Sequence, residues 1–136
     1  MTALTADRDT VNRAGLLFSY PAKSGVLFFV GAIAAIDSAT GLVTKGAAST
    51  TLKGAGIVQE QVDNTAGADG AVNVTIRRGQ WRVANSAGAD QLTLKDIGAP
   101  AYIVDDQTVA KTDGGGTRSI AGTVIDIDPG GVWVAF

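Results

Sequence analysis

The sequence predicts an all-β fold, a small β-barrel or a jelly-roll-like sandwich. Three observations indicate this class. The 136 residues include 18 glycines, about twice the usual share, which suits a chain with many tight turns. Long charged helix formers are scarce, and Glu60 is the only glutamate. Short runs of β-branched and aromatic residues recur between turn residues, as is typical of sandwiches and barrels.

The chain also contains an approximate internal repeat. Its first copy consists of AAID at 34–37, VTK at 43–45, AGIV at 55–58 and GAVNV at 70–74. Its second copy consists of YIVD at 102–105, VAK at 109–111, AGTV at 121–124 and GGVWV at 130–134. Lys45 and Lys111 have the same spacing as Gly56 and Gly122. We therefore predict that the fold is built from two duplicated β-units.

The first residues are expected to form an extended N-terminal arm. Residues 1–13 are polar and show neither helical nor strand periodicity. Two interpretations stay open for them, a frayed terminus and an arm that becomes ordered on a partner. Residues 15–20 are apolar and end at Pro21, which is typical of a short edge strand. We place the arm at residues 1–23 and a single β domain at residues 24–136.

The first half of the domain predicts strands separated by turns. The apolar run 26–36, broken at Gly31, is rich in β-branched residues, which favours a buried strand over a helix. Residues 37–41 contain the Asp and Gly of a turn, and further strands are expected over 42–44 and 57–62.

Strict alternation of apolar and polar residues over 72–77 predicts a half-buried strand. The alternation breaks at Arg78-Gly79 and resumes at Trp81, so we expect a bulge at Gly79.

The second half predicts one helical turn and four strands. Thr93 to Asp96 resembles a capping box in which Asp replaces the usual Glu, and Gly98 suits the end of a single helical turn. The predicted strands are 102–104, 108–111, 120–127 and 132–136. The last two are joined by Asp-Pro-Gly-Gly, a strong hairpin signal.

Composition excludes several kinds of chemistry. The chain has no cysteine and no histidine, so it lacks thiol nucleophiles, disulfides and the usual general base. A net charge of −2 argues against nucleic acid as the main partner. The apolar run 26–36 is too short for a membrane span, and it follows Asp7, Arg8 and Asp9 rather than a short basic leader. We expect a soluble protein without membrane partner, metal or cofactor.

Two segments imitate functional motifs. Asp105, Asp106, Asp126 and Asp128 are the densest carboxylates and suggest either a calcium site or an acid pair, but we favour turn and outward-facing strand residues. The glycines at 114–116 resemble a phosphate loop. Such loops precede a helix, whereas a strand follows here, so we predict a flexible hairpin loop.

Arginine and tryptophan alternate in the segment RRGQWR at 77–82. Three interpretations are open: a solvated strand face with arginine stems over Trp81, a protein interface, or a nucleic-acid contact. The net charge disfavours the third interpretation.

Several segments together resemble one known family. They are GAIAAIDSATG at 31–41, GAGIVQEQVDN at 54–64, VTIRRGQWRVANSAGAD at 74–90 and the C-terminal stretch from 102 to 136. These segments are similar to the capsid cement, or head decoration, proteins of tailed bacteriophages and related prophages. VDDQTV at 104–109 and the GVWV ending at 131–134 are the most specific parts. The resemblance covers roughly residues 25–136.

The resemblance implies a β-barrel or jelly-roll-like protein on the outside of an icosahedral shell. There it would bridge neighbouring major capsid subunits as a small homo-oligomer, a dimer or a trimer, without enzymatic activity. The protein would be made in the bacterial host cytoplasm and located on the virion exterior.

We predict two contact surfaces for this role. The segment 13–20 would lie on the capsid as an extended arm or an added strand. The face formed by residues 77–82 would contact the capsid or a sister subunit. The candidate residues are Arg13, Leu17, Phe18, Tyr20, Arg77, Arg78, Trp81 and Arg82.

Two other functions remain open. One is a β-sandwich module that binds carbohydrate or a host surface, displayed on the virion, which needs an exposed aromatic platform from only two Trp and two Tyr residues. The other is a carboxylate-based hydrolase, for which Asp105 and Asp126 are the candidate acids.

Overall fold

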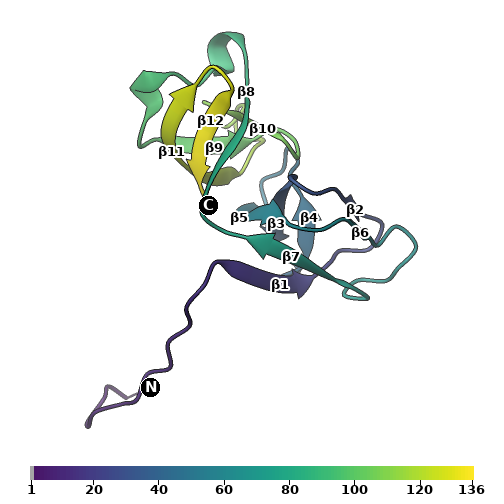
Figure 1. The fold of residues 1–136 in the computed structure, drawn as a ribbon, viewed down its shortest axis with the longest axis vertical. Coiled ribbons are helices and arrows are strands. Elements are labelled where there is room, and N and C mark those ends of the chain that lie inside the picture. The colour runs from purple at the N-terminus through teal and green to yellow at the C-terminus, as the bar shows by residue number, and fades with distance from the viewer. Residues whose placement is uncertain (1) are drawn as a thin grey trace.

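The regular structure of residues 2–136 consists of β-strands and two single turns of 3-10 helix (Figure 1). The strands gather into two lobes that follow one another in the sequence, and the N-terminal residues extend away from them. This computed structural model describes residues 2–136, so residue 1 of the predicted arm lies outside the described residues. The predicted all-β class is confirmed.

The first lobe is built on a five-stranded antiparallel sheet with the order β1-β7-β5-β3-β4. Its strands are β1 (Leu17–Pro21), β3 (Ile33–Asp37), β4 (Val43–Lys45), β5 (Leu52–Val58) and β7 (Asn73–Arg77). A two-stranded ribbon of β2 (Leu27–Phe28) and β6 (Val62–Asp63) accompanies the sheet. In β7 the predicted alternation is confirmed, because Val74 and Ile76 are buried while their neighbours are partly or fully exposed.

The second lobe is a closed five-stranded barrel with the order β10-β8-β12-β11-β9. Its strands are β8 (Gln80–Asn85), β9 (Pro100–Ile103), β10 (Thr108–Ala110), β11 (Ile120–Asp128) and β12 (Gly131–Ala135). The 3-10 turns η1 (Gly88–Asp90) and η2 (Leu94–Asp96) lie between β8 and β9. The predicted capping box is present at η2, where the Thr93 N–H donates to the Asp96 carboxylate at 2.7 Å.

The two lobes share one strand order, which confirms the predicted duplication. The strands β1, β7, β5, β3 and β4 correspond in turn to β8, β12, β11, β9 and β10. In the second lobe β8 pairs with β10 in parallel, with Asn85 opposite Val109. In the first lobe the equivalent closure is a single parallel bridge between Ala22 and Val43. The first lobe is thus a five-stranded sheet whose two edges meet at one bridge, whereas the second lobe is a closed barrel.

The structure corrects the alignment of the repeat in the strands β3 and β9. Gly56 lies opposite Ala34, whereas Gly122 lies opposite Ala101. Ala34 therefore corresponds to Ala101, not to Tyr102 as the sequence alignment has it. The lengths of the turns after β3 and β9 differ, and this difference moves the matching letters by one position.

A second correction concerns β7 and β12. Val58 pairs with Ile76 in the first lobe, and its equivalent Val124 pairs with Val134 in the second. Ile76 therefore corresponds to Val134, two positions away from the sequence alignment. The connection before β7 is long and includes β6, whereas a tight turn precedes β12, so equal spacing in sequence does not give equal register.

Close strand contacts explain why glycine occurs at 56 and 122 in both copies. A side chain at Gly122 would overlap the carbonyl oxygen of Ala135, and one at Gly56 would overlap the carbonyl oxygen of Arg77. Arg77 and Ala135 are equivalent residues of the two lobes. At each of these glycines the pairing of the strand shifts register, which is typical of a β-bulge.

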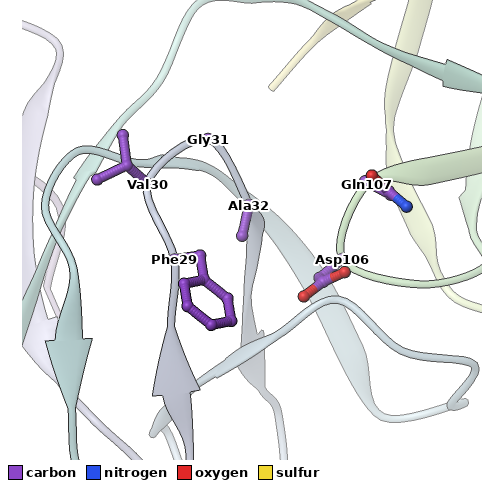
Figure 2. A pocket seen from close by; sticks show the side chains of 6 residues that line it. All are labelled: Phe29, Val30, Gly31, Ala32, Asp106 and Gln107. Carbon is purple, nitrogen blue, oxygen red and sulfur yellow. The ribbon is translucent and has the colours of Figure 1, made fainter.

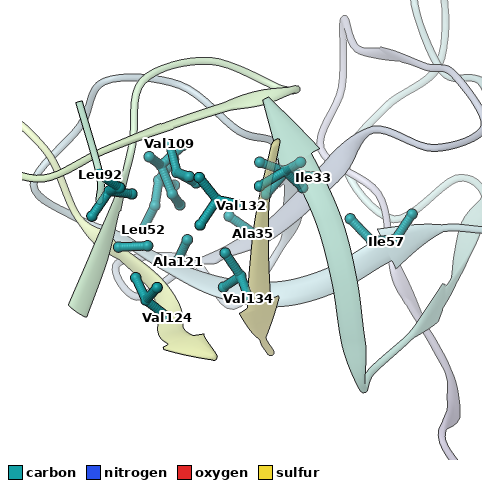
Figure 3. Packing of buried hydrophobic residues seen from close by; sticks show 13 residues of the cluster. Ile33, Ala35, Leu52, Ile57, Leu92, Val109, Ala121, Val124, Val132 and Val134 are labelled. Carbon is teal, nitrogen blue, oxygen red and sulfur yellow. The ribbon is translucent and has the colours of Figure 1, made fainter. Parts of the chain in front are cut away.

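One apolar core joins the two lobes (Figure 3). From the first lobe it takes Ile33, Ala35, Leu52 and Ile57, and from the second it takes Val83, Leu92, Ala101, Ile103, Val109, Ala121, Val124, Val132 and Val134. A separate cluster lies within the first lobe and contains Ala22, Phe28, Ala32, Ala34, Val43, Ala55, Val58, Val74 and Ile76. The buried Ser119 links the lobes further, because its Oγ accepts a hydrogen bond from the Leu52 N–H at 3.1 Å.

Two sequence predictions change at the lobe boundaries. The arm predicted over residues 1–23 ends earlier, because residues 17–21 form β1 and pair with β7. The predicted bulge at Gly79 is instead the point where the chain passes from β7 in the first lobe to β8 in the second. Gly79 has a φ of 126°, a value that favours glycine.

Candidate interaction surface

Most of the predicted contact residues meet at the root of the arm. The root lies where β1 pairs with the end of β7 and the chain turns into β8. In this pairing Leu17 lies opposite Arg77, and both side chains are exposed. Phe18 and Tyr20 point to the other face of β1, are partly buried, and stack with ring centroids 6.0 Å apart.

Two arginines lie against one aromatic ring. The guanidinium carbons of Arg13 and Arg78 lie 5.0 and 5.1 Å from the centroid of the Phe18 ring. Such contacts are cation–π interactions, which stabilise a cation over the face of an aromatic ring. The Arg78 amide also donates to the Leu16 carbonyl at 2.9 Å, so this arginine is held by backbone and ring together.

The arginines at the arm root lack acidic partners among residues 2–136. The ion pairs in this range are Arg82 with Asp128, Lys111 with Asp96, and Arg118 with Asp90. In addition, the Nε atom of Arg78 is buried and has no hydrogen-bond acceptor. A buried donor without an acceptor is costly.

Exposed leucines border these cations. Leu16 and Leu17 are 48% and 54% exposed. With Ala14, Gly15 and Arg77 they line a shallow hollow of about 490 Å³. Leu17 and Arg77 lie on one face of the β1–β7 pair, whereas Arg13 and Arg78 lie against Phe18 on the other face, just beyond the end of β7. We call Arg13, Leu16, Leu17, Arg77 and Arg78, which together run across the end of this strand pair, the arginine surface. It combines positive charge with apolar area.

Trp81 connects this surface to the core of the molecule. Its Nε1–H donates to the Arg77 carbonyl at 3.2 Å, and its side chain packs against the core that joins the lobes. Trp81 therefore holds the corner between β7 and β8 in place.

Arg82, in contrast, belongs to another part of the molecule. It lies 3.6 Å from the Asp128 carboxylate and 6.0 Å from the ring centroid of Trp133. The Trp133 Nε1–H donates to Asp128 at 2.7 Å, and this bond together with the Gly130 amide lowers the pKa of the Asp128 carboxyl. Adjacent residues of a strand point to opposite faces, so Trp81 and Arg82 do not form one surface.

The two carboxylates considered as hydrolase acids accept local backbone hydrogen bonds, Asp105 in the turn before β10 and Asp126 within β11. Asp105 accepts from the amides of Gln107 and Thr108, and Asp126 accepts from the amide of Ile127. Residues 2–136 contain no group of three or more acidic, histidine or cysteine side chains placed to hold a metal ion. In the same range, no helix combines the length and the apolar character needed to cross a membrane.

One hollow lies at a turn that the sequence prediction missed (Figure 2). It has a volume of about 390 Å³ and is lined by residues 29–32 together with Asp106 and Gln107. Phe29 and Val30 are 52% and 64% exposed there, although both lie in the predicted buried run. The signal was Gly31, which has a φ of 87° and turns the chain between β2 and β3.

The chain was compared with known protein families and structures. No family model, no curated protein and no solved structure matches the chain.

Proposed function

We propose that this protein is a structural virion protein that binds the outer surface of a phage capsid. It bridges major capsid subunits and stabilises the expanded, DNA-filled head. The observation that carries the proposal is an exposed arm with a cationic and apolar surface at its root, on a double β-body whose sequence resembles head decoration proteins. The proposed partners are the major capsid protein and further copies of this chain.

The physical mechanism requires shared area rather than a reaction. Packed DNA pushes the shell outward, and a rigid body across the seam between subunits adds contacts that must break before the shell opens. A protein that binds only the expanded lattice stabilises that state by mass action. An oligomer that contacts several subunits at once binds far more tightly than one contact would.

Electron microscopy of the purified protein mixed with empty capsid shells tests the proposal. Expanded shells should show regular added density at lattice positions, and unexpanded procapsids should show much less. Bare expanded shells after mixing and washing would refute the proposed function.

The contribution of the arm can be separated from the fold. Deleting residues 2–14 removes the exposed segment and leaves β1 paired with β7. We expect this variant to keep its far-UV circular dichroism and thermal midpoint but to lose particle binding. Normal decoration by the truncated protein would show that the arm is not a capsid contact.

One observation favours a second candidate function, a carbohydrate- or host-binding module. Trp133 lies on the outer face of the barrel beside Arg82 and Asp128, and sugar sites often combine an aromatic ring with charged groups. A glycan array with wild type and Trp133→Ala tests it. Specific binding that Trp133→Ala abolishes would favour this module over the capsid role.

A further inference from the structure

The arm carries acidic residues that have no partner in the described chain. Asp7 and Asp9 are exposed and form no ion pair among residues 2–136. In an extended segment alternate residues share a face, so Val11, which is 92% exposed, follows them on the same side. This face of the arm thus presents two carboxylates and then an apolar side chain, while Arg8, between the two aspartates, lies on the opposite face.

The arginine surface presents the complementary groups. Arg77 and Arg78 lack carboxylates, and Leu17 beside them is exposed. The carboxylates of the arm are thus complementary to the arginines of this surface, and the exposed Val11 is complementary to the exposed leucines.

The arm is poorly placed to bind its own arginine surface. It leaves the first lobe and extends away from the body (Figure 1). Only residues 10–12 separate Asp9 from Arg13, and they include neither glycine nor proline for a tight reversal onto that arginine. The first glycine after Asp9 is Gly15, which has a φ of 109°. An extended segment from Asp9 to Leu17 spans about 26–29 Å, which is enough to reach a neighbouring molecule.

We propose that the arm of one copy binds the arginine surface of a second copy. Asp7 and Asp9 pair with Arg77 and Arg78, and Val11 covers Leu17. The contact joins unlike surfaces, so repeating it gives a ring if the rotation closes and an open filament if it does not. A nucleic-acid ligand fits less well, because the chain has a net charge of −2 and leucines border the arginines. This inference does not depend on capsid binding.

Sedimentation velocity at low-micromolar to high-micromolar concentration tests the proposal. We compare wild type with Asp7→Asn/Asp9→Asn and with Arg77→Gln/Arg78→Gln. Wild type should sediment as an oligomer, and each double variant should dissociate at a concentration at least about tenfold higher. The control Glu60→Gln/Asp126→Asn makes the same charge change as the arm variant at exposed body positions and should behave as wild type.

Charge exchange gives the sharper test. Asp7→Arg/Asp9→Arg and Arg77→Asp/Arg78→Asp should each be monomeric alone but should associate when mixed, because only the mixture offers opposite charges. If replacing Arg78 prevents folding, as circular dichroism would show, Arg77→Asp alone serves in the same mixture. Raising the salt from 0.1 to 1 M shortens the screening length from about 10 to about 3 Å and should weaken every association.

A monomeric wild type, an oligomer that survives both double-neutral variants, or a mixture that fails to associate would each overturn the proposal. Binding to shells is measured separately on the same proteins. Loss of decoration by an intact oligomer would count against the proposed function and leave this inference standing.

Discussion

The glycines at 114–116 form one turn of left-handed backbone. Their φ values are 64°, 73° and 86°. The Asp113 carbonyl accepts from the amides of Thr117 and Arg118 at 2.9 and 3.0 Å. Arg118 then donates to the Asp90 carboxylate at 3.1 Å, which ties the turn to η1. The flexible hairpin loop predicted from the sequence is instead a hydrogen-bonded turn that needs glycine, and the strands on either side of it, β10 and β11, do not pair with each other.

Replacing Gly115 tests this conformational requirement. No atom outside its immediate neighbours lies within 4 Å of a Cβ at this position, so only the backbone angle matters. Gly115→Ala should lower the free energy of unfolding by about 1–2 kcal/mol, the cost of left-handed backbone for an L-residue. Gly115→Asn is the matched control and should cost less, because Asn tolerates this conformation. Urea denaturation measures both, and equal losses would contradict the explanation.

Several aspartates stabilise the fold only while they are ionised. Hydrogen bonds from Thr93 lower the pKa of Asp96, those from Thr112 and Arg118 lower the pKa of Asp90, and the one from Trp133 lowers the pKa of Asp128. A lowered pKa means that the unfolded chain takes up protons first as the pH falls. The stability is therefore fully present above the unfolded value of about 3.9 and is lost as the pH falls through the lower folded values.

The thermal midpoint between pH 7 and pH 2 measures this loss. Wild type should lose stability mainly below about pH 4. Asp96→Asn should be less stable than wild type at pH 7, and the two midpoints should converge in acid. A constant difference between the two proteins across this range would contradict the assignment.

The duplicated strand pattern depends on places where two backbones approach closely. Gly122 is such a place, because a Cβ there would overlap the Ala135 carbonyl. Gly122→Ala should destabilise the protein by about 3 kcal/mol, at the upper end of the usual cost of overpacking. Gly41→Ala is the control, since it lies in a turn with open space around it, and should cost about 1–2 kcal/mol. Chemical denaturation that ranks the two variants in the opposite order would argue against a steric role for Gly122.

Strand alternation was predictable where one face is buried, as in β7. The way in which one strand connects to the next was not predictable from the sequence. At Gly79 the sequence shows only that the alternation of apolar and polar residues is interrupted. A β-bulge and a connection between two lobes would both produce this interruption, so the sequence does not distinguish them. At Gly31 a turn lies within a short apolar run. A strand that is buried on both faces is apolar throughout, so it has no alternation of apolar and polar residues whose interruption would indicate a turn.

The two lobes are expected to unfold together because one core joins them. Both tryptophans, Trp81 and Trp133, lie in the second lobe, whereas Ile76 is buried in the cluster confined to the first. Ile76→Ala should cost about 2–5 kcal/mol. If the molecule is one cooperative unit, the unfolding midpoint should fall equally by tryptophan fluorescence and by far-UV circular dichroism. A fluorescence transition that keeps its wild-type midpoint would show that the lobes unfold independently.

The residues of the candidate surface were only partly predictable from the sequence. Adjacency in the chain suggested that Arg77, Arg78, Trp81 and Arg82 act together. Strand geometry separates Arg82 from the others, and the pairing of β1 with β7 brings Arg13 and Phe18 to Arg78 across some sixty residues. Contacts at this separation leave no local pattern in the sequence.

The sequence by itself determined the all-β class, most of the turns and the existence of two related units, because these follow from local conformational preference and from which residues must be buried. Only the tertiary structure decided the register of the second unit against the first, the closure of the second unit into a barrel and the merging of their cores. These depend on pairing between distant strands, whose free energy comes from backbone hydrogen bonds and buried area that no single segment contains.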